Sequence, residues 1–584
     1  MKKKVFALLL CGLPLMINAQ DAFDVLHLSQ TELRGTSRFQ SMAGAFGALG
    51  GDLSTLTQNP AGIGVYRNSD LGITFSLDFN TTKAGTKPGV ITTTNETKFN
   101  VNNVGYVGVI RLDSESVPNL NFGFTYNRLH SFNRHYKGGV ADIPYSMSNF
   151  IADEFINMGG FTDDDLYWSD DFNPYINGDA PRVAVTMYDM PTSTGGRVGI
   201  INNVALPNSQ GNYAFDDDGY SIYGEQVMGL YGAGTAGYAN YEVNEQGHAD
   251  EYNIAFGGNI ANKVYFGLDF GILDLNYKSV QDYEESLTNA YVKPNDVDML
   301  YNDIINNGTR ANWGVRNILY TDGTGVNFKM GLIWKPTQAL RIGAAFHTPT
   351  YYDMHDAVMV KTYLDAYQDN SMLYTANKES NEGRFTYTIK TPWRFIGSLA
   401  GVIGTNGIIS MDYEYVANET MRVGEDRGND WPEITYNIKN CFKPSHIIRL
   451  GGEYRANPNW SLRAGYSYKT EQVKKGIDNY TFEGIDPLYE EGGESTYVIS
   501  TVGDNPAYQY DNSVQNITCG VGYRYKSFYA DVAYVHTIRN SVYNAFSNVL
   551  VYDNRGGLVF ESPNVGTDVS DHNNRLSLTM GVRF

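Results

Sequence analysis

Four basic residues are the strongest candidates for chemistry in this sequence: Lys329, Arg341, Arg449 and Arg463. Each occupies a polar position in a run where apolar residues recur at every second position, so each shares a strand face with polar neighbours. Where such a face borders an aqueous interior, a cation can hold the carboxylate of an amphipathic ligand. The alternative is that these cations pair with acidic side chains and water. For any single one of the four, that alternative has the better general support.

Other reactive residue types do not form a recognisable site. His130 and His135 stand close together in "HSFNRHYKGG", but two histidines without further ligands are usually solvated loop residues. The sequence contains no G-x-S-x-G elbow and no metal-binding Cys/His spacing. The "DDDG" segment lacks the alternating ligands of a calcium loop. We therefore predict no enzyme activity, no metal site and no cofactor.

The first twenty residues, "MKKKVFALLLCGLPLMINAQ", have the pattern of a signal peptide. Three lysines precede an apolar run, and the run ends in small residues near Ala19. Lipidation at Cys11 is the alternative, but the residues before it do not form a lipoprotein cleavage site. We predict export with cleavage after residues 1–19.

Composition indicates what kind of exported protein this is. No later run of about 18 apolar residues is present, which excludes helical membrane spans. The chain has 44 Tyr, 28 Phe and 61 Gly and yet a mean hydropathy of -0.35, as expected when lipid-facing and water-facing residues alternate. The net charge of -20 argues against a nucleic-acid partner. A membrane β-barrel is favoured over a large secreted β-protein.

Period-two alternation locates the membrane strands. In the first, Leu71, Ile73, Phe75, Leu77 and Phe79 share one face. We predict about 14 antiparallel strands, an even number as single-chain bacterial barrels have. Their ranges are 71–79, 101–112, 119–129, 251–260, 263–277, 326–335, 339–348, 385–403, 407–416, 446–455, 460–469, 514–525, 527–537 and 574–584.

The connections between these strands alternate short and long, as periplasmic turns and extracellular loops do in outer-membrane barrels. The longest, at about 130–250, is a predicted extracellular insertion, and whether it forms loops, extra strands or a subdomain stays open. The final "RLSLTMGVRF" ends in Phe584 and resembles the C-terminal signal read by the barrel-assembly machinery. We predict a monomer in the outer membrane, in contact with lipid and lipopolysaccharide.

Several segments resemble the FadL/TodX family of outer-membrane transporters for hydrophobic compounds. The N-terminal one is "RGTSRFQSMAGAFGALGGDLSTLTQNPAGIG", which contains the family's Asn-Pro-Ala motif at Asn59, Pro60 and Ala61. Others are "WKPTQALRIGAAFHTPT", "TPWRFIGSLAG", "LGGEYRANPNWSLRAGYSYK" and "CGVGYRYKSFYADVAYVHT". Residues 130–320 carry almost no resemblance.

The resemblance implies a barrel at 71–584 plugged by an N-terminal hatch at 20–70, with ligand leaving sideways through the wall. Physics supports a plug, because fourteen strands enclose a lumen wider than side chains can fill. Pro60 and Gly62 make "NPAG" a turn, which we place at the joint between hatch and wall as the hatch's anchor.

The leading hypothesis is passive uptake of hydrophobic or amphipathic small molecules of the long-chain fatty acid type. The alternative is a surface barrel of a secretion machine that binds cargo proteins, since some Bacteroidota-like members of the superfamily have that role. A haemin receptor is a minor alternative, because relatives have been labelled so and because of His130 and His135.

Overall fold

The structure is a computed structural model that describes residues 22–85, 91–112, 114–157, 198–215, 222–223, 225–293, 304–425, 429–474, 507–547, 550–552, 558–561 and 566–584. The predicted signal peptide and its cleavage site lie outside these ranges. Within them, no helix is both long enough and apolar enough to cross a membrane.

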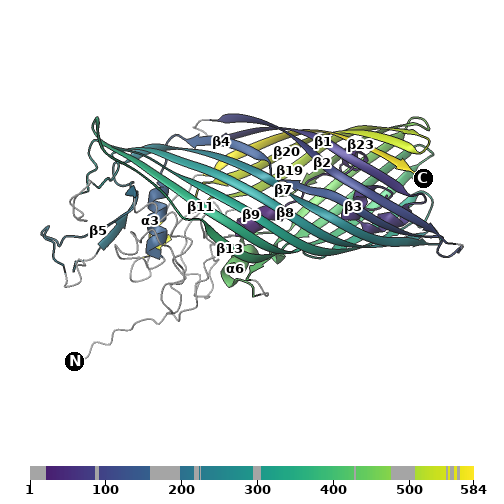
Figure 1. Cartoon of the computed structure of the whole chain (residues 1–584), viewed down its shortest axis with the longest axis horizontal. Helices are drawn as coiled ribbons and strands as arrows, with labels where there is room; N and C mark the ends of the chain where they lie inside the picture. The colour runs from purple at the N-terminus through teal and green to yellow at the C-terminus, as the bar shows by residue number, and fades with distance from the viewer. Residues whose placement is uncertain are drawn as a thin grey trace, which may run out of the picture.

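The strands form one antiparallel sheet that closes on itself, because β1 pairs with β2 on one side and with β23 on the other (Figure 1). Following the hydrogen-bonded neighbours around the described residues gives fourteen strand positions, as predicted. The strands are β1 (Asp70–Gly85), β2 (Thr92–Arg111), β3 (Asn119–Ser131), β4 (Arg134–Val140), β7 (Ala236–Ile260), β8 (Val264–Thr288), β9 (Thr309–Trp334), β10 (Leu340–His347), β11 (Tyr351–Gln368), β12 (Ser371–Glu379), β13 (Gly383–Lys390), β14 (Trp393–Ile403), β15 (Gly407–Ala417), β16 (Arg422–Gly424), β17 (Ser445–Arg455), β18 (Trp460–Lys469), β19 (Tyr508–Tyr525), β20 (Phe528–Asn544) and β23 (Thr567–Arg583).

Some strand positions are interrupted part-way along. β10 and β11 both pair with β9, and β3 and β4 both pair with β7, so each pair of strands occupies one position in the wall. Pro349 lies in the break between β10 and β11, and Pro392 lies in the break between β13 and β14. Proline has no N–H to donate to a ladder, which explains an interruption at these two points.

The outward face carries the lipid-facing belt. On β8, the exposed residues Phe266, Leu268, Phe270 and Ile272 are followed on the same face by polar Asp274. The strand nevertheless continues to Thr288. Apolar alternation in the sequence therefore marks only the stretch in contact with lipid. On β8 the outward face beyond it is largely polar, whereas the inward face packs into an apolar cluster in the lumen. The backbone ladder continues there, so several strands are longer than predicted.

The turns at the end opposite the long connections are tight. Ala261 and Asn262, with φ of 50° and 56°, connect β7 to β8, and Lys526, with φ of 53°, connects β19 to β20. Residues 236–250 belong to β7, so strand structure extends into the range predicted as an extracellular insertion.

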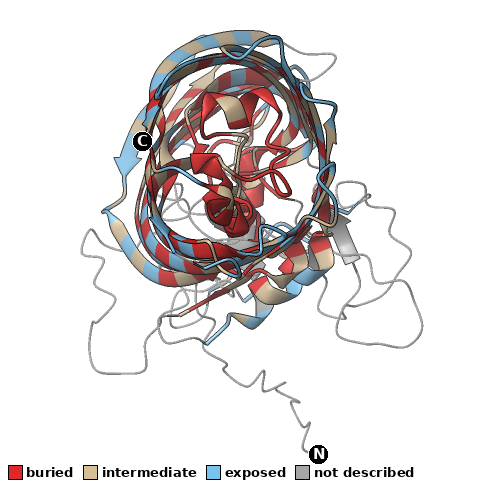
Figure 2. Cartoon of the chain, turned by 90° about the vertical axis from the view of Figure 1, so that its right-hand side faces the viewer, coloured by how far each residue is buried: buried red, intermediate tan, exposed pale blue. Residues whose placement is uncertain are grey.

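The N-terminal segment lies inside the barrel, and Figure 2 shows it as a buried body surrounded by the wall. Its short elements are α1 (Ala22–Leu28), α2 (Ser37–Ser41), η1 (Leu53–Thr57) and η2 (Pro60–Val65). Small residues dominate between α2 and η1, which lets the backbone pack closely against the inner wall. From here on, the name hatch refers to this described segment, residues 22–66.

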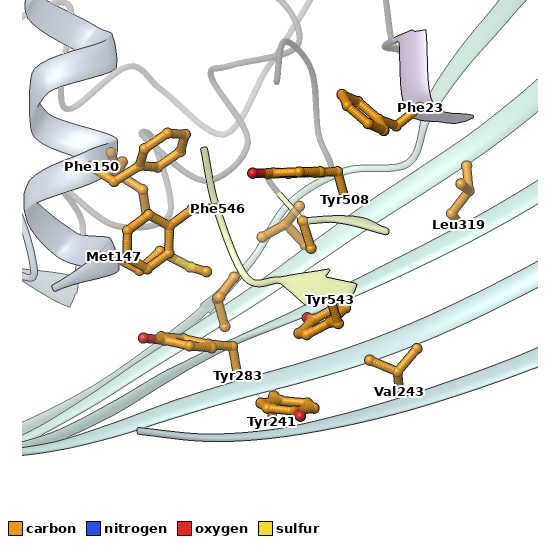
Figure 3. Packing of buried hydrophobic residues seen from close by; sticks show 14 of the residues in the cluster. Phe23, Met147, Phe150, Tyr241, Val243, Tyr283, Leu319, Tyr508, Tyr543 and Phe546 are labelled. Atoms are coloured by element: carbon orange, nitrogen blue, oxygen red, sulfur yellow. The ribbon is translucent and has the colours of Figure 1, made fainter. Parts of the chain in front are cut away.

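The remaining elements lie at the end of the barrel that carries the long connections. They are α3 (Met147–Asn157), the pair β5 (Asn202–Ala205) and β6 (Glu225–Met228), η5 (Asn418–Thr420), α6 (Pro432–Cys441) and the pair β21 (Leu550–Tyr552) and β22 (Leu558–Glu561). A large apolar cluster fills the lumen there, and α1 contributes Phe23 to it (Figure 3). The Phe23 ring lies 4.8 Å from the Tyr508 ring and 5.2 Å from the Phe442 ring, centroid to centroid.

Candidate functional site

A cavity of about 160 Å³, which we call the large cavity, lies between the hatch and the inward faces of the barrel. The hatch contributes residues 30–34 and 57–58 to its lining. The wall contributes apolar Leu129, Phe132, Ile396, Ile447 and Val514 together with many charged groups. A cavity that combines apolar and cationic lining suits an amphipathic anion.

A buried ion cluster ties one side of the hatch to the wall. Arg34 lies 2.9 Å from Asp78 on β1 and 2.6 Å from Glu32, and Arg575 on β23 lies 2.7 Å from Asp78. Burial raises the pKa of Glu32. The electrostatic effect of Arg34, His130, Arg539 and Arg575 is larger than the effect of burial and holds that pKa well below its usual range. Glu32 is therefore a fixed negative charge at the cavity edge.

A second cluster fastens the hatch at another point of the wall. Arg38 of α2 lies 3.0 Å from Glu453 on β17. The same carboxylate lies 2.8 Å from Arg463 on β18, and Arg463 lies 2.5 Å from Asp531 on β20. Removing one partner from such a buried network leaves an uncompensated charge, which is costly. The hatch is thus held by charge at two places.

The "NPAG" segment contacts both the hatch and the wall. Asn59 caps η2 by accepting a hydrogen bond from the Ala61 N–H at 3.0 Å, and it donates to the Gly47 carbonyl at 2.6 Å. A Cβ at Gly62 would lie 2.5 Å from Thr55 Oγ1, so glycine is required by the close approach. These contacts fit the anchor role predicted for Asn59, Pro60, Ala61 and Gly62. That role stays a prediction.

Inward-facing glycines receive the hatch along the wall, and sequence reasoning did not identify them. A side chain at each would overlap hatch atoms: Gly267 meets Pro60, Gly331 meets Asn59, Gly343 meets Gly47, and Gly451 and Gly465 meet Met42 or Ala43. The sequence signal that could have identified them is the repeated occurrence of a glycine at an inward position in several strands of one half of the barrel.

The four predicted cations have different surroundings. Lys329 lies in a smaller cavity of about 70 Å³, with its ammonium 2.6 Å from Glu251 and 3.2 Å from Asp269. Arg341 donates to the Leu49 carbonyl of the hatch at 2.8 Å. Arg463 belongs to the second ion cluster, and Arg449 lines the large cavity. The ligand role of all four stays a prediction, and Arg449 alone of the four faces the large cavity.

Next to Arg449 the cavity wall carries two more cations. Arg394 on β14 and Arg449 share the carboxylate of Glu414 on β15, at 3.4 Å and 2.5 Å. Lys469 on β18 donates to the Gln30 side chain of the hatch. The sequence places these residues on inward positions, but it does not show that strands β14, β15, β17 and β18 bring them together.

The two histidines do not converge. His130 lines the large cavity, where its ring lies 6.5 Å from that of His27. His135 on β4 is partly exposed and lies 2.7 Å from Glu242. Among the described residues, no group of three or more His, Cys, Asp and Glu side chains is placed to hold a metal ion.

The wall has a break in its ladder beside the cavity. β2 pairs with β3 only as far as Asn103 and Asn127, whereas β4 stays paired with β7. Over the described residues, the backbone of β2 from 92 to 102 has a ladder partner in β1 alone. Phe99 in this stretch is 63% exposed on the lipid face. Residues 128–134, which line the cavity, belong to the end of β3 and the start of β4 beside the break.

Comparisons with known proteins agree with this architecture. The model of the family described as outer membrane protein transport protein (OMPP1/FadL/TodX) matches residues 177–481, just over half of the 584 residues. This range includes much of the region in which we find little resemblance, and it does not include the "NPAG" segment. No curated protein matches the chain.

The chain also has similarity to solved structures. A Pseudomonas aeruginosa FadL homologue is 12% identical with a TM-score of 0.45, covering 95% of this chain and 99% of its own. The P. putida toluene transporter TodX is 11% identical with a TM-score of 0.42 and the same coverage. The Ralstonia pickettii toluene transporter TbuX is 12% identical with a TM-score of 0.41, covering 94% and 99%.

Proposed function

Because the chain belongs to the OMPP1/FadL/TodX family of outer-membrane transport proteins, we propose that it takes up amphipathic molecules of the long-chain fatty acid type. Uptake is passive and needs no cofactor. The ligand enters from the extracellular end, rests in the large cavity and leaves sideways into the membrane. The hatch, proposed at 20–70, closes the way to the periplasm.

The observation that carries this proposal is the lining of the large cavity. Arg449 supplies a cation from the wall, while Ile396, Ile447 and Val514 supply apolar surface beside it. Burying an acyl chain there is favourable, and a guanidinium is a good partner for a carboxylate. We propose Arg449, among the four predicted cations, as the headgroup contact.

The ladder break between β2 and β4 supports the lateral exit. The break is bridged by side chains, since Arg128 donates to Asn100 at 2.8 Å and the Thr94 hydroxyl donates to the His135 carbonyl. Side-chain contacts can separate without disrupting a continuous backbone ladder. A ligand can therefore pass between β2 and β4 at lower cost than between fully paired strands.

The test measures initial uptake of radiolabelled oleate by cells that lack their own fatty acid transporter and express this chain. We expect uptake above the empty-vector level and a loss of about tenfold in Arg449→Gln, as for one lost charge-assisted contact. Arg316→Gln is the matched control, because Arg316 is 52% exposed and paired with Asp282 outside the cavity.

The alternatives are distinguished by what co-purifies with the full chain in neutral detergent. Fatty acid mass by native mass spectrometry supports the proposal. A stoichiometric protein partner would favour the secretion barrel, and a Soret band would favour the haemin receptor. Either result, together with oleate uptake that is no higher than the empty-vector level, would overturn the proposed function.

A further inference from the structure

One part of the large cavity brings three cations together. The cationic corner consists of Arg394, Glu414, Arg449 and Lys469 on the neighbouring strands β14, β15, β17 and β18. The register places Glu414 opposite Ile447 and Ile447 opposite Lys469, so these side chains lie on one inner surface. Among the described residues, Glu414 is the one carboxylate within 4.0 Å of these three cations, and it contacts Arg394 and Arg449.

Elsewhere around the cavity each arginine has a carboxylate partner. The other cations are held by carboxylates as follows: Arg34, Arg539 and Arg575 by Glu32, Asp78 and Asp511, Arg128 by Asp250, and Arg134 by Asp571. The remaining cavity carboxylate, Glu245 on β7, is contacted by His27, Tyr277 and Gln509. Among the described cavity residues, the cation without such a partner is therefore Lys469 of the corner.

Atoms of the corner are short of anionic partners. Arg449 Nη1 is buried and has no hydrogen-bond acceptor among the described residues. No carboxylate in the described part of the chain lies within 4.0 Å of Lys469 Nζ. A buried cation without a counter-ion is unfavourable, so an anion from outside the chain would be bound strongly here.

The hatch supplies neutral oxygens in place of an anion. Gln30 accepts from Lys469, and the Thr31 hydroxyl accepts from Arg394 Nη1 at 3.0 Å. Gln30 is held in position by donating to Gln472 at 2.9 Å. An amide oxygen and a hydroxyl carry only partial charge, so an oxyanion would compete with them successfully.

We propose that the cationic corner binds a headgroup that carries two negative charges, of the phosphate-monoester type. Two guanidinium groups and an ammonium supply enough N–H donors for a tetrahedral oxyanion, and a dianion is attracted to them more strongly than a carboxylate is. Ile396, Ile447 and Val514 line the cavity beside it and would contact the alkyl chain. This inference rests on the proposed function and narrows its substrate class.

The test uses the purified full chain in a neutral detergent at pH 7, where a phosphate monoester is mostly dianionic. Calorimetry compares dodecyl phosphate, dodecanoate and inorganic phosphate. We expect dodecyl phosphate to bind about tenfold more tightly than dodecanoate, as for one additional charge-assisted contact.

Two variants probe the corner from opposite directions. Lys469→Met should weaken dodecyl phosphate binding about tenfold and abolish its advantage over dodecanoate. Gln30→Glu places a carboxylate beside Lys469 and should also remove the advantage, without losing any cation. Lys361→Met is the matched control, because Lys361 is 42% exposed and paired with Glu379 on β12.

Equal binding of dodecyl phosphate and dodecanoate, or an unchanged ratio in both variants, would overturn this inference and leave the proposed function standing. Inorganic phosphate binding as tightly as dodecyl phosphate would support the dianion site and contradict an amphiphilic substrate. Binding of neither amphiphile would contradict the proposed function itself.

Discussion

Asn59 in the hatch lies directly against Gly331 on β9, where a methyl group would be 1.9 Å from Asn59 Oδ1. The amide group of Asn59 also caps η2 and donates to the Gly47 carbonyl. A single close contact between hatch and wall therefore fixes the turn that connects them.

Gly331→Ala should displace the hatch, because the added methyl has no space and the neighbouring atoms belong to a capped turn. We expect a loss of about 1–3 kcal/mol in the free energy of unfolding and faster leakage of small hydrophilic solutes. Liposome swelling measures the leakage. Gly397→Ala is the control, since nothing lies within 4 Å of a Cβ at Gly397. Equal swelling rates for both variants would contradict the contact.

Asp78→Asn should release the hatch from β1, because Arg34 and Arg575 would lose their shared carboxylate. Breaking a buried ion network costs about 3–5 kcal/mol. Hydrogen exchange of residues 29–40 measures the release as faster exchange. Asp282→Asn removes an exposed partner of Arg316 and should cost at most about 1 kcal/mol. Exchange that stays slow in Asp78→Asn would show that the cluster does not hold the hatch.

The docking of α3 should depend on pH through Glu285. This residue lies on β8 well beyond Ile272, the last apolar residue of the lipid-facing run, and accepts from Met147 N at 2.8 Å and from Trp313 Nε1 at 3.0 Å. Burial raises the pKa of Glu285 to about 7, although its hydrogen bonds oppose that shift.

The folded state therefore binds a proton that the unfolded state has released between pH of about 4.5 and 7. This contribution to stability is complete below about pH 4.5 and is lost as the pH rises through 7. Hydrogen exchange of α3, corrected for the intrinsic rate, should show protection falling over that range. Glu285→Gln should flatten the dependence, and an unchanged slope in that variant would exclude Glu285 as its source.

Joining β2 to β4 should block the lateral exit. The Thr94 hydroxyl donates to the backbone carbonyl of His135 across the ladder break, so Thr94→Cys with His135→Cys introduces one thiol on each side of the opening. We expect oxidation to reduce oleate uptake at least tenfold and a reductant to restore it. The chain with its own Cys441 and Cys519 is the control. Full uptake after verified cross-linking would mean that ligand leaves by another route.

The lateral break, the glycine contacts and the cationic corner are not visible in the sequence for a common reason. Each depends on which residues face one another across the lumen or between strands. Arg394 and Lys469 are both on predicted strands, but their proximity depends on the stagger of four strands, which apolar alternation does not specify. Gln30 contacts Lys469 because of the position that the hatch takes along the barrel axis inside the lumen.

The sequence by itself determined the class of molecule. Period-two alternation, short and long connections and aromatic richness are local properties, and they identify a fourteen-strand outer-membrane barrel because lipid on one side and water on the other impose that pattern on each strand separately. It also determined that Lys329, Arg341, Arg449 and Arg463 occupy polar strand positions. Only the tertiary structure decided which of these cations are neutralised, because the partners Glu251, Glu453 and Asp531 come from distant parts of the chain. It also decided that Arg449 shares Glu414 with Arg394 and that Lys469 has an amide oxygen of the hatch as its partner.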